Sequence, residues 1–191
     1  MIIENHPLSP FLPDGTRLLM LGSFPPPRKR WSMEFYYPNL NNDMWRIMGH
    51  LFFEDKNHFL TADRKAFCKE SIITFLKEKH IALFDTGSQV CRLQDNASDK
   101  FLDIITPTDI QQLLKQLPEC QAIVTTGQKA TDTLRQQIDV ADPAVGHYAD
   151  FRFIDRPMRL YRMPSSSRAY PLALEQKASH YRTLFEDLHL L

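Results

Sequence analysis

The residue types best suited to chemistry cluster in MEFYYPNLNNDMWRIM, residues 33–48. Four aromatic residues surround three asparagines there: Phe35, Tyr36, Tyr37 and Trp45 around Asn39, Asn41 and Asn42. An asparagine can hydrogen-bond the edge of a nucleobase or orient a water molecule, while an aromatic face stacks on the base. The alternative is a loop whose asparagines cap a helix and whose aromatic side chains fill a core. The segment by itself leaves both interpretations open.

A second candidate is RLLMLGSFPPPRKRW, residues 17–31. An apolar run ends at Gly22 and continues into three prolines, after which Arg28, Lys29 and Arg30 precede Trp31. Each proline fixes its own φ angle, so the loop is stiff. The segment is either a surface turn with a solvated charge cluster or a ligand loop at the carboxyl end of a strand.

Four short apolar runs indicate the strands that would position these loops. They are residues 17–23, 81–87, 122–127 and 159–165. The first three are almost continuously apolar and end in glycine, which is typical of parallel strands covered on both faces. The fourth is more mixed in composition.

Helical periodicity fills the intervals between the strands. It covers residues 44–52, 63–79, 110–117, 128–138 and 174–188, with Asp43 as the expected N-cap of the first helix. Segment 139–158 is irregular and could hold a hairpin or an insertion. Strands that alternate with helices predict an α/β fold, a three-layer α/β/α domain with a central four-stranded parallel sheet. We expect a single domain over residues 1–191.

In an open parallel sheet, ligands bind outside the carboxyl ends of the strands. The four loops at those ends read GSFPPPRKRW, DTGSQVCR, TTGQKAT and PSSSRAY, and they are rich in small and hydroxyl residues. Helices follow at least two of them, and a helix N-terminus can bind an anion. TGQK could hold a phosphate or could be only a tight connection.

Several other chemistries lack their sequence signatures. The chain has no GxGxxG, P-loop or GxSxG motif, and its seven histidines form no HxxxH pair. Its three cysteines, Cys68, Cys91 and Cys120, are widely spaced, which argues against disulfides and metal sites and favours small buried residues. We expect no metal and no cofactor.

The composition is that of an ordinary globular protein. Of 191 residues, 43% are hydrophobic and 24% are charged, and the formal net charge is zero. Neutrality gives no support for nucleic-acid binding, but it leaves room for a local basic patch. No signal peptide and no apolar run of membrane-spanning length is visible, so we expect a cytoplasmic protein without a membrane partner.

Five motifs, taken in order, resemble the uracil-DNA glycosylase superfamily, most closely its hypoxanthine/deoxyinosine and mismatch-specific branch. They are GSFPPP, YYPNLNNDMWRIM, IALFDTGSQVCR, AIVTTGQKA and MPSSSRAY, and they span nearly the whole chain. The resemblance implies a uracil-DNA glycosylase-like fold and a monofunctional enzyme of base-excision repair. Such an enzyme flips a deaminated base, uracil or hypoxanthine, out of DNA and hydrolyses its N-glycosidic bond without a metal or cofactor. The implied partner is DNA with a damaged or deaminated base, bound by a monomer.

The resemblance also implies roles for single residues. Asn42 stands at the catalytic asparagine, which positions the attacking water. The base pocket would be formed by Gly22, Ser23, Phe24, Pro25 and Thr126. DNA contacts would come from Ser165, Ser166, Ser167 and Arg168, with Arg28, Lys29 and Arg30 beside them.

The sequence departs from the family pattern around the base pocket. Pro26 replaces a glycine, Thr126 replaces a base-reading asparagine, and Arg168 replaces a proline. Threonine has one hydroxyl and a shorter reach, whereas asparagine presents both a donor and an acceptor. Two alternatives therefore stay open: a protein of this fold that binds nucleic acid or a modified base without cleavage, and an N-glycosidase that acts on free nucleosides.

Overall fold

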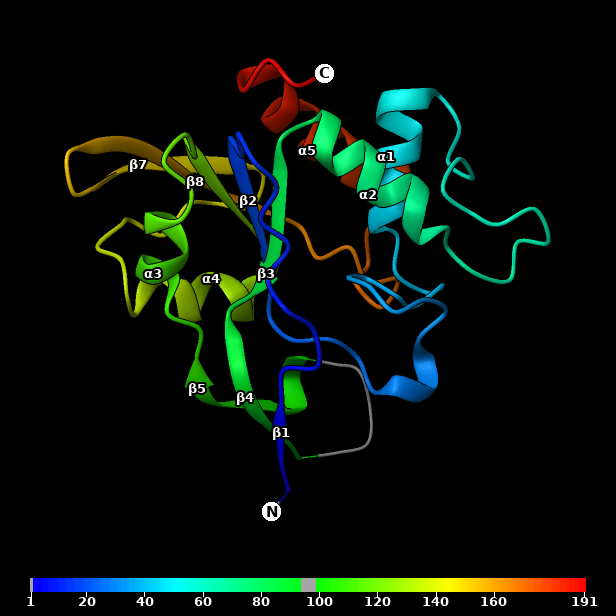
Figure 1. Ribbon diagram of the computed structural model, residues 1–191, viewed down its shortest axis with the longest axis horizontal. Coiled ribbons are helices and arrows are strands. Elements are labelled where there is room, and N and C mark those ends of the chain that lie inside the picture. The colour runs from blue at the N-terminus through cyan, green and yellow to red at the C-terminus, as the bar shows by residue number, and fades with distance from the viewer. Residues whose placement is uncertain (1, 94–98) are drawn as a thin grey trace.

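A central sheet of five strands forms the middle of the molecule, with the strand order β3-β2-β6-β8-β7. The computed structural model describes residues 2–93 and 99–191. The first four strands run parallel to one another, and β7 pairs antiparallel with β8 at the edge (Figure 1). The strands are β2 (Leu18–Gly22), β3 (Ile81–Asp85), β6 (Ala122–Thr126), β8 (Arg156–Met163) and β7 (His147–Phe153).

The three glycine-ended apolar runs form the strands predicted from them. Every residue of β2, β3 and β6 is buried, as expected for strands covered on both faces. The predicted four-stranded parallel sheet is present, but the count of four strands was too low. The hairpin considered for segment 139–158 supplies the fifth strand, β7, which buries Phe151 and Phe153 and leaves polar residues outside.

Helices cover both faces of the sheet. Figure 1 shows α1, α2 and α5 on one side and α3 and α4 on the other. Phe52 of α1 links the three helices of the first group. The centre of its ring lies 4.9 Å from that of Phe75 in α2 and 5.0 Å from that of Phe185 in α5. The helices are α1 (Met44–Phe53), α2 (Lys69–Glu78), α3 (Ile110–Lys115), α4 (Gln128–Arg135) and α5 (Leu174–Asp187). The predicted fold class is thereby confirmed.

One local helix prediction was wrong in its start, and the predicted N-cap residue of α1 is correct in position. The predicted helix over residues 63–79 begins only at Lys69, because Asp63 accepts hydrogen bonds from Thr61 Oγ1 and the Lys65 N–H and so closes a turn. Asp43 occupies the N-cap position of α1, but its side chain makes no capping hydrogen bond. Asn42 Oδ1 instead accepts the N–H of Met44 at 2.9 Å.

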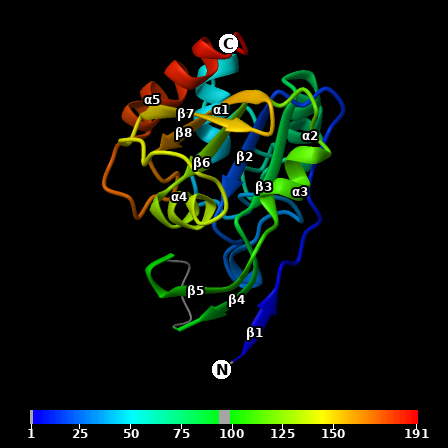
Figure 2. The same ribbon diagram turned by 90° about the vertical axis from the view of Figure 1, so that its left-hand side faces the viewer.

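A small antiparallel sheet, in the order β1-β4-β5, lies beyond one end of the central sheet (Figure 2). The chain leaves β3 at Asp85 and enters β4 at Gly87, so this connection leads to a strand and not to a helix. A short 3-10 helix, η2 (Asp99–Phe101), directly precedes β5. The strands are β1 (Ile3–Asn5), β4 (Gly87–Arg92) and β5 (Leu102–Pro107).

Three further findings concern the cysteines, the helix lengths and the possible metal-binding groups. Cys91 and Cys120 are buried, Cys68 is half-buried, and all three are free thiols. Within residues 2–93 and 99–191, no helix is long and apolar enough to cross a membrane. No group of three or more His, Cys, Asp or Glu side chains in that part of the chain is arranged to hold a metal ion.

Candidate functional site

A cavity of about 740 Å³ lies at the carboxyl ends of β2, β3, β6 and β8. It collects most of the site residues predicted from the sequence, although these come from segments far apart in the chain. The predicted residues that line it are Gly22, Ser23, Phe24, Pro25, Arg30, Asn42, Thr126, Ser165, Ser166, Ser167 and Arg168. Arg28 and Lys29 are not part of its wall.

The floor of the cavity is formed by the last residues of three neighbouring strands. Asp85 ends β3, Gly22 ends β2 and Thr126 ends β6. Tyr37 reaches over this floor, and its hydroxyl lies 3.1 Å from Thr126 Oγ1. Burial and the charge of Asp85 raise the pKa of Tyr37, so its hydroxyl keeps its proton.

Asp85 is held from outside the cavity by His6. Its Oδ2 lies 2.8 Å from His6 Nε2, and both side chains are more than nine-tenths buried. Its other oxygen, Oδ1, lies over Gly22, where an added Cβ would be only 2.5 Å away. Any side chain at position 22 would therefore displace this carboxylate.

Asp99 brings a second carboxyl group to the cavity wall. Its Oδ1 accepts a hydrogen bond from Ser23 Oγ at 2.7 Å. Burial raises the pKa of Asp99, the charge of Asp85 adds to this rise, and the Ser23 hydrogen bond opposes it. A carboxyl group in such a place gains its proton more readily than one in water.

The raised pKa of Asp99 predicts a pH-dependent stability. A carboxyl group whose pKa is raised in the folded state contributes stability that is fully present below its unfolded-state pKa of about 4. This contribution is lost as the pH rises through the folded-state pKa. An Asp99→Asn variant cannot lose that contribution. We expect its free energy of unfolding, relative to the natural protein, to increase from acid to neutral pH in denaturant titrations. Exposed Asp103 provides the control, since Asp103→Asn should show a difference that stays flat with pH.

Asn42 joins the first turn of α1 to the serine loop. Its oxygen caps the helix through Met44, and its backbone forms an isolated antiparallel bridge with Ser167. Two further backbone hydrogen bonds join the same two segments: the Asp43 N–H donates to Ser166 O at 2.8 Å, and the Arg168 N–H donates to Asn41 O at 3.1 Å. The proposed water-positioning side chain is thus held at a fixed point of the cavity wall.

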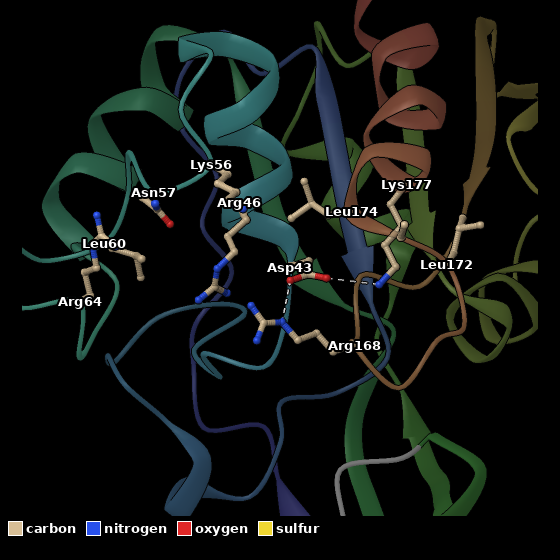
Figure 3. Close-up of a pocket in the computed structure, with 11 residues that line it drawn as sticks. Asp43, Arg46, Lys56, Asn57, Leu60, Arg64, Arg168, Leu172, Leu174 and Lys177 are labelled. Atoms are coloured by element: carbon tan, nitrogen blue, oxygen red, sulfur yellow. Dashed lines mark hydrogen bonds and ion pairs between the residues drawn. The ribbon is translucent and has the colours of Figure 1, made fainter.

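An ion-pair cluster is centred on Asp43, the residue that follows Asn42 in the chain (Figure 3). Asp43 is 8% exposed in its side chain, and its carboxylate lies 3.0 Å from Arg168 Nε and 3.5 Å from Lys177 Nζ. Lys177 is 1% exposed and also donates to Ser167 O at 2.8 Å. The cluster therefore ties α5 to both loops of the site.

The same cluster borders a second hollow of about 620 Å³. Five cationic side chains line it against one carboxylate, as Figure 3 shows. They are Arg46, Lys56, Arg64, Arg168 and Lys177, facing Asp43. Arg46 donates to Leu40 O at 2.7 Å, and burial followed by the charge of Arg168 lowers its pKa.

The proline loop is braced from both sides. Trp31 Nε1 donates to Pro26 O at 2.7 Å, and the guanidinium of Arg28 stacks over the Trp31 ring at 4.6 Å. Arg28 also pairs with Glu34 on the surface. Arg92, on the other side, donates to Pro25 O at 2.5 Å. Arg28 and Arg92 therefore have structural partners within the protein, and Arg30 is the predicted loop cation that faces the cavity.

Sequence reasoning missed four side chains of this region: His6, Asp85, Asp99 and Lys177. Asp85 could have been found, because it is the only charged residue in the buried run 81–87 and it stands at a strand end. Asp99 and His6 lie in segments without periodicity. Lys177 lies on the apolar face of α5 three residues after Leu174, where a lysine is normally interpreted as solvent-exposed.

Comparison with solved structures finds a similar fold. A solution NMR structure of a putative uracil DNA glycosylase from Methanosarcina acetivorans aligns with a TM-score of 0.67 and 22% sequence identity. The alignment covers 98% of this chain and 99% of that chain. No family model matches this sequence, and no curated protein matches it. The likeness extends over the complete alpha/beta architecture, including the strands whose ends build the cavity.

Proposed function

We propose that this protein is a DNA glycosylase that releases a deaminated base from DNA by hydrolysing its N-glycosidic bond. The observation that carries the proposal is the common cavity. It unites Asn42, the 22–25 loop, Thr126 and the 165–167 serine loop, which are the segments that resemble glycosylase motifs. The shared fold with the Methanosarcina protein supports the same conclusion.

The chemistry of the reaction fits these groups. As the bond between C1′ and the base nitrogen breaks, its electron pair leaves with the base, and a water oxygen adds to C1′. One proton of this water stays on the new C1′ hydroxyl, and the other ends on the released base. Asn42 would hold this water with its amide, since positioning alone contributes several kcal/mol to such a step. The backbone N–H groups of Ser23 and Phe24 would face the negative charge that develops on the departing base.

The cavity rim has the charge needed for DNA. Arg30, Lys129 and Arg168 lie along it, together with the hydroxyls of Ser165 and Ser167. Cations and hydroxyls of this kind contact backbone phosphates irrespective of sequence. A flipped nucleotide would then place its base inside the cavity and its phosphates along the rim.

The test is incubation with duplexes that contain uracil, hypoxanthine, xanthine or ethenocytosine, followed by alkaline cleavage at abasic sites. We expect abasic sites from at least one of the four. Their absence from all four would overturn the enzymatic proposal. Binding should also weaken as salt rises, because released counterions drive association with phosphates; an affinity that is insensitive to salt would contradict DNA as the partner.

Binding without cleavage is the second candidate, and two contacts favour it. The Asn42 oxygen already accepts the Met44 N–H, and the Thr126 hydroxyl is already engaged by Tyr37. Both groups would therefore have fewer free hydrogen-bonding positions for a water or a base. Tight, lesion-dependent binding to one of the four duplexes without abasic sites would support this candidate.

A further inference from the structure

The second hollow, of about 620 Å³, gathers more positive charge than its one carboxylate can balance. Asp43 already divides its two oxygens between Arg168 and Lys177. Within residues 2–93 and 99–191, the remaining three cations of the wall form no ion pair with an acidic side chain. They are Arg46, Lys56 and Arg64. A chain with a formal net charge of zero thus concentrates positive charge in one place.

Two guanidinium groups are held close together in this hollow. Figure 3 shows those of Arg46 and Arg168 side by side below Asp43. Burial and then the charge of Arg168 lower the pKa of Arg46, and Asp43 opposes this effect. Arg46 is fixed in place, since its Nη1 donates to Leu40 O at 2.7 Å and its guanidinium lies over the Phe67 ring at 5.3 Å. An anion beside the two groups would replace their repulsion with attraction.

The hollow adjoins the cavity at the strand ends. Arg168 lines both, and Asp43 at the edge of the hollow directly follows Asn42, which lines the cavity. Apolar side chains complete the wall of the hollow: Leu60, Leu172 and Leu174. Cations together with apolar surface suit a sugar–phosphate chain, because its deoxyribose carbons separate charged phosphates.

We propose that the hollow binds a backbone phosphate of the DNA strand that carries the flipped base. The proposal rests on the proposed glycosylase function and extends the DNA contact beyond the five motifs, because Lys56 and Arg64 lie outside them. A strand with one nucleotide in the cavity would pass Arg168 and present a neighbouring phosphate to these two cations.

The exposure of Lys56 and Arg64 favours a DNA strand over a small free anion. Water and salt screen the attraction between exposed charges, so two such cations hold a free anion weakly. A strand already bound at the cavity rim brings its next phosphate to the hollow at high effective concentration.

Removal of the two exposed cations tests this contact. The probe is a duplex with a tetrahydrofuran abasic site, which has no base to release. For a Lys56→Gln/Arg64→Gln variant, we expect an affinity about tenfold lower at low salt and a salt slope smaller by about 1. The control is Lys77→Gln/Lys115→Gln, which removes two exposed lysines on α2 and α3 and should change the affinity less than about twofold. An unchanged affinity and slope in the first variant would overturn the proposal.

Neutral phosphates locate the partner of these cations. A methylphosphonate removes the charge of one phosphate, and it is introduced at one position at a time on either strand of the probe. At one position beside the abasic site, it should weaken binding by the natural protein about tenfold and binding by the Lys56→Gln/Arg64→Gln variant less than about threefold. Additive losses at every position, or coupling only on the complementary strand, would contradict the proposed phosphate.

These binding measurements separate the phosphate site from the proposed function, because they require no base release. Coupled losses would support the site even if no lesion duplex is cleaved, and cleavage without coupling would overturn the site alone. Inorganic phosphate tests the other occupant. Thermal stabilisation by phosphate that is lost in Lys56→Gln/Arg64→Gln, with DNA affinity unchanged, would assign the hollow to a free anion and overturn the proposal. The same thermal denaturation shows that each variant is folded.

Discussion

Replacement of Asn42 by alanine is expected to slow base release by about a hundredfold to a thousandfold. The alanine removes the amide that would hold the attacking water, while the remainder of the cavity keeps its shape. Single-turnover cleavage of the best duplex from the four-lesion panel measures the loss. A rate within about threefold of the natural protein would contradict the water-positioning role.

The effect of Asn42→Ala on the rate must be separated from its effect on folding, because Asn42 also caps α1. Losing the cap through Asn42→Ala should cost about 1 kcal/mol of stability. Asn42→Ser retains a capping oxygen but has no amide to hold the water, so we expect near-natural stability and the same loss of rate. Asn41→Ala removes an exposed neighbouring asparagine side chain and should leave the rate within about threefold.

The central sheet could be predicted because the burial of its inner strands dictates their apolar residue pattern. Strands such as β2, buried at every position, require continuous apolar runs, and their glycine ends mark where the chain must turn. The edge strand β7 is half exposed, and its sequence mixes aromatic and charged residues, so it could be suspected only as a hairpin. The turn over residues 63–68 depends on side-chain hydrogen bonds of Asp63 that compete with helix periodicity.

The residues of the candidate site could be proposed from the sequence where motifs cluster at strand ends, but not where the site depends on tertiary contacts. Asn42 and the serine loop could be named because their segments resemble a known family. The ion pair of Asp43 with Lys177 joins residues 134 positions apart, which no local pattern reveals. Asp43 stands at the expected N-cap position of α1, but its carboxylate pairs with two cations and makes no capping hydrogen bond.

Replacement of Lys177 by methionine is expected to lower the free energy of unfolding by about 3 kcal/mol. Methionine fills a similar volume but leaves Asp43 with the half-exposed Arg168 and leaves Ser167 O with the Tyr170 N–H, which donates to it at 3.1 Å. Denaturant titration measures the change. Lys115→Met, the same substitution at an exposed site on α3, should change stability by less than about 0.5 kcal/mol.

A second variant shows whether the weaker compensation of the Asp43 charge causes this loss. Asp43→Asn in the Lys177→Met background removes that charge, so the double variant should be more stable than Lys177→Met alone. If the two substitutions simply add, the lysine contributes packing and not an ion pair. The single variant should also slow base release, because Lys177 holds the Ser167 backbone that pairs with Asn42. A destabilised protein with an unchanged single-turnover rate below its melting temperature would show that the cluster serves the fold and not the site.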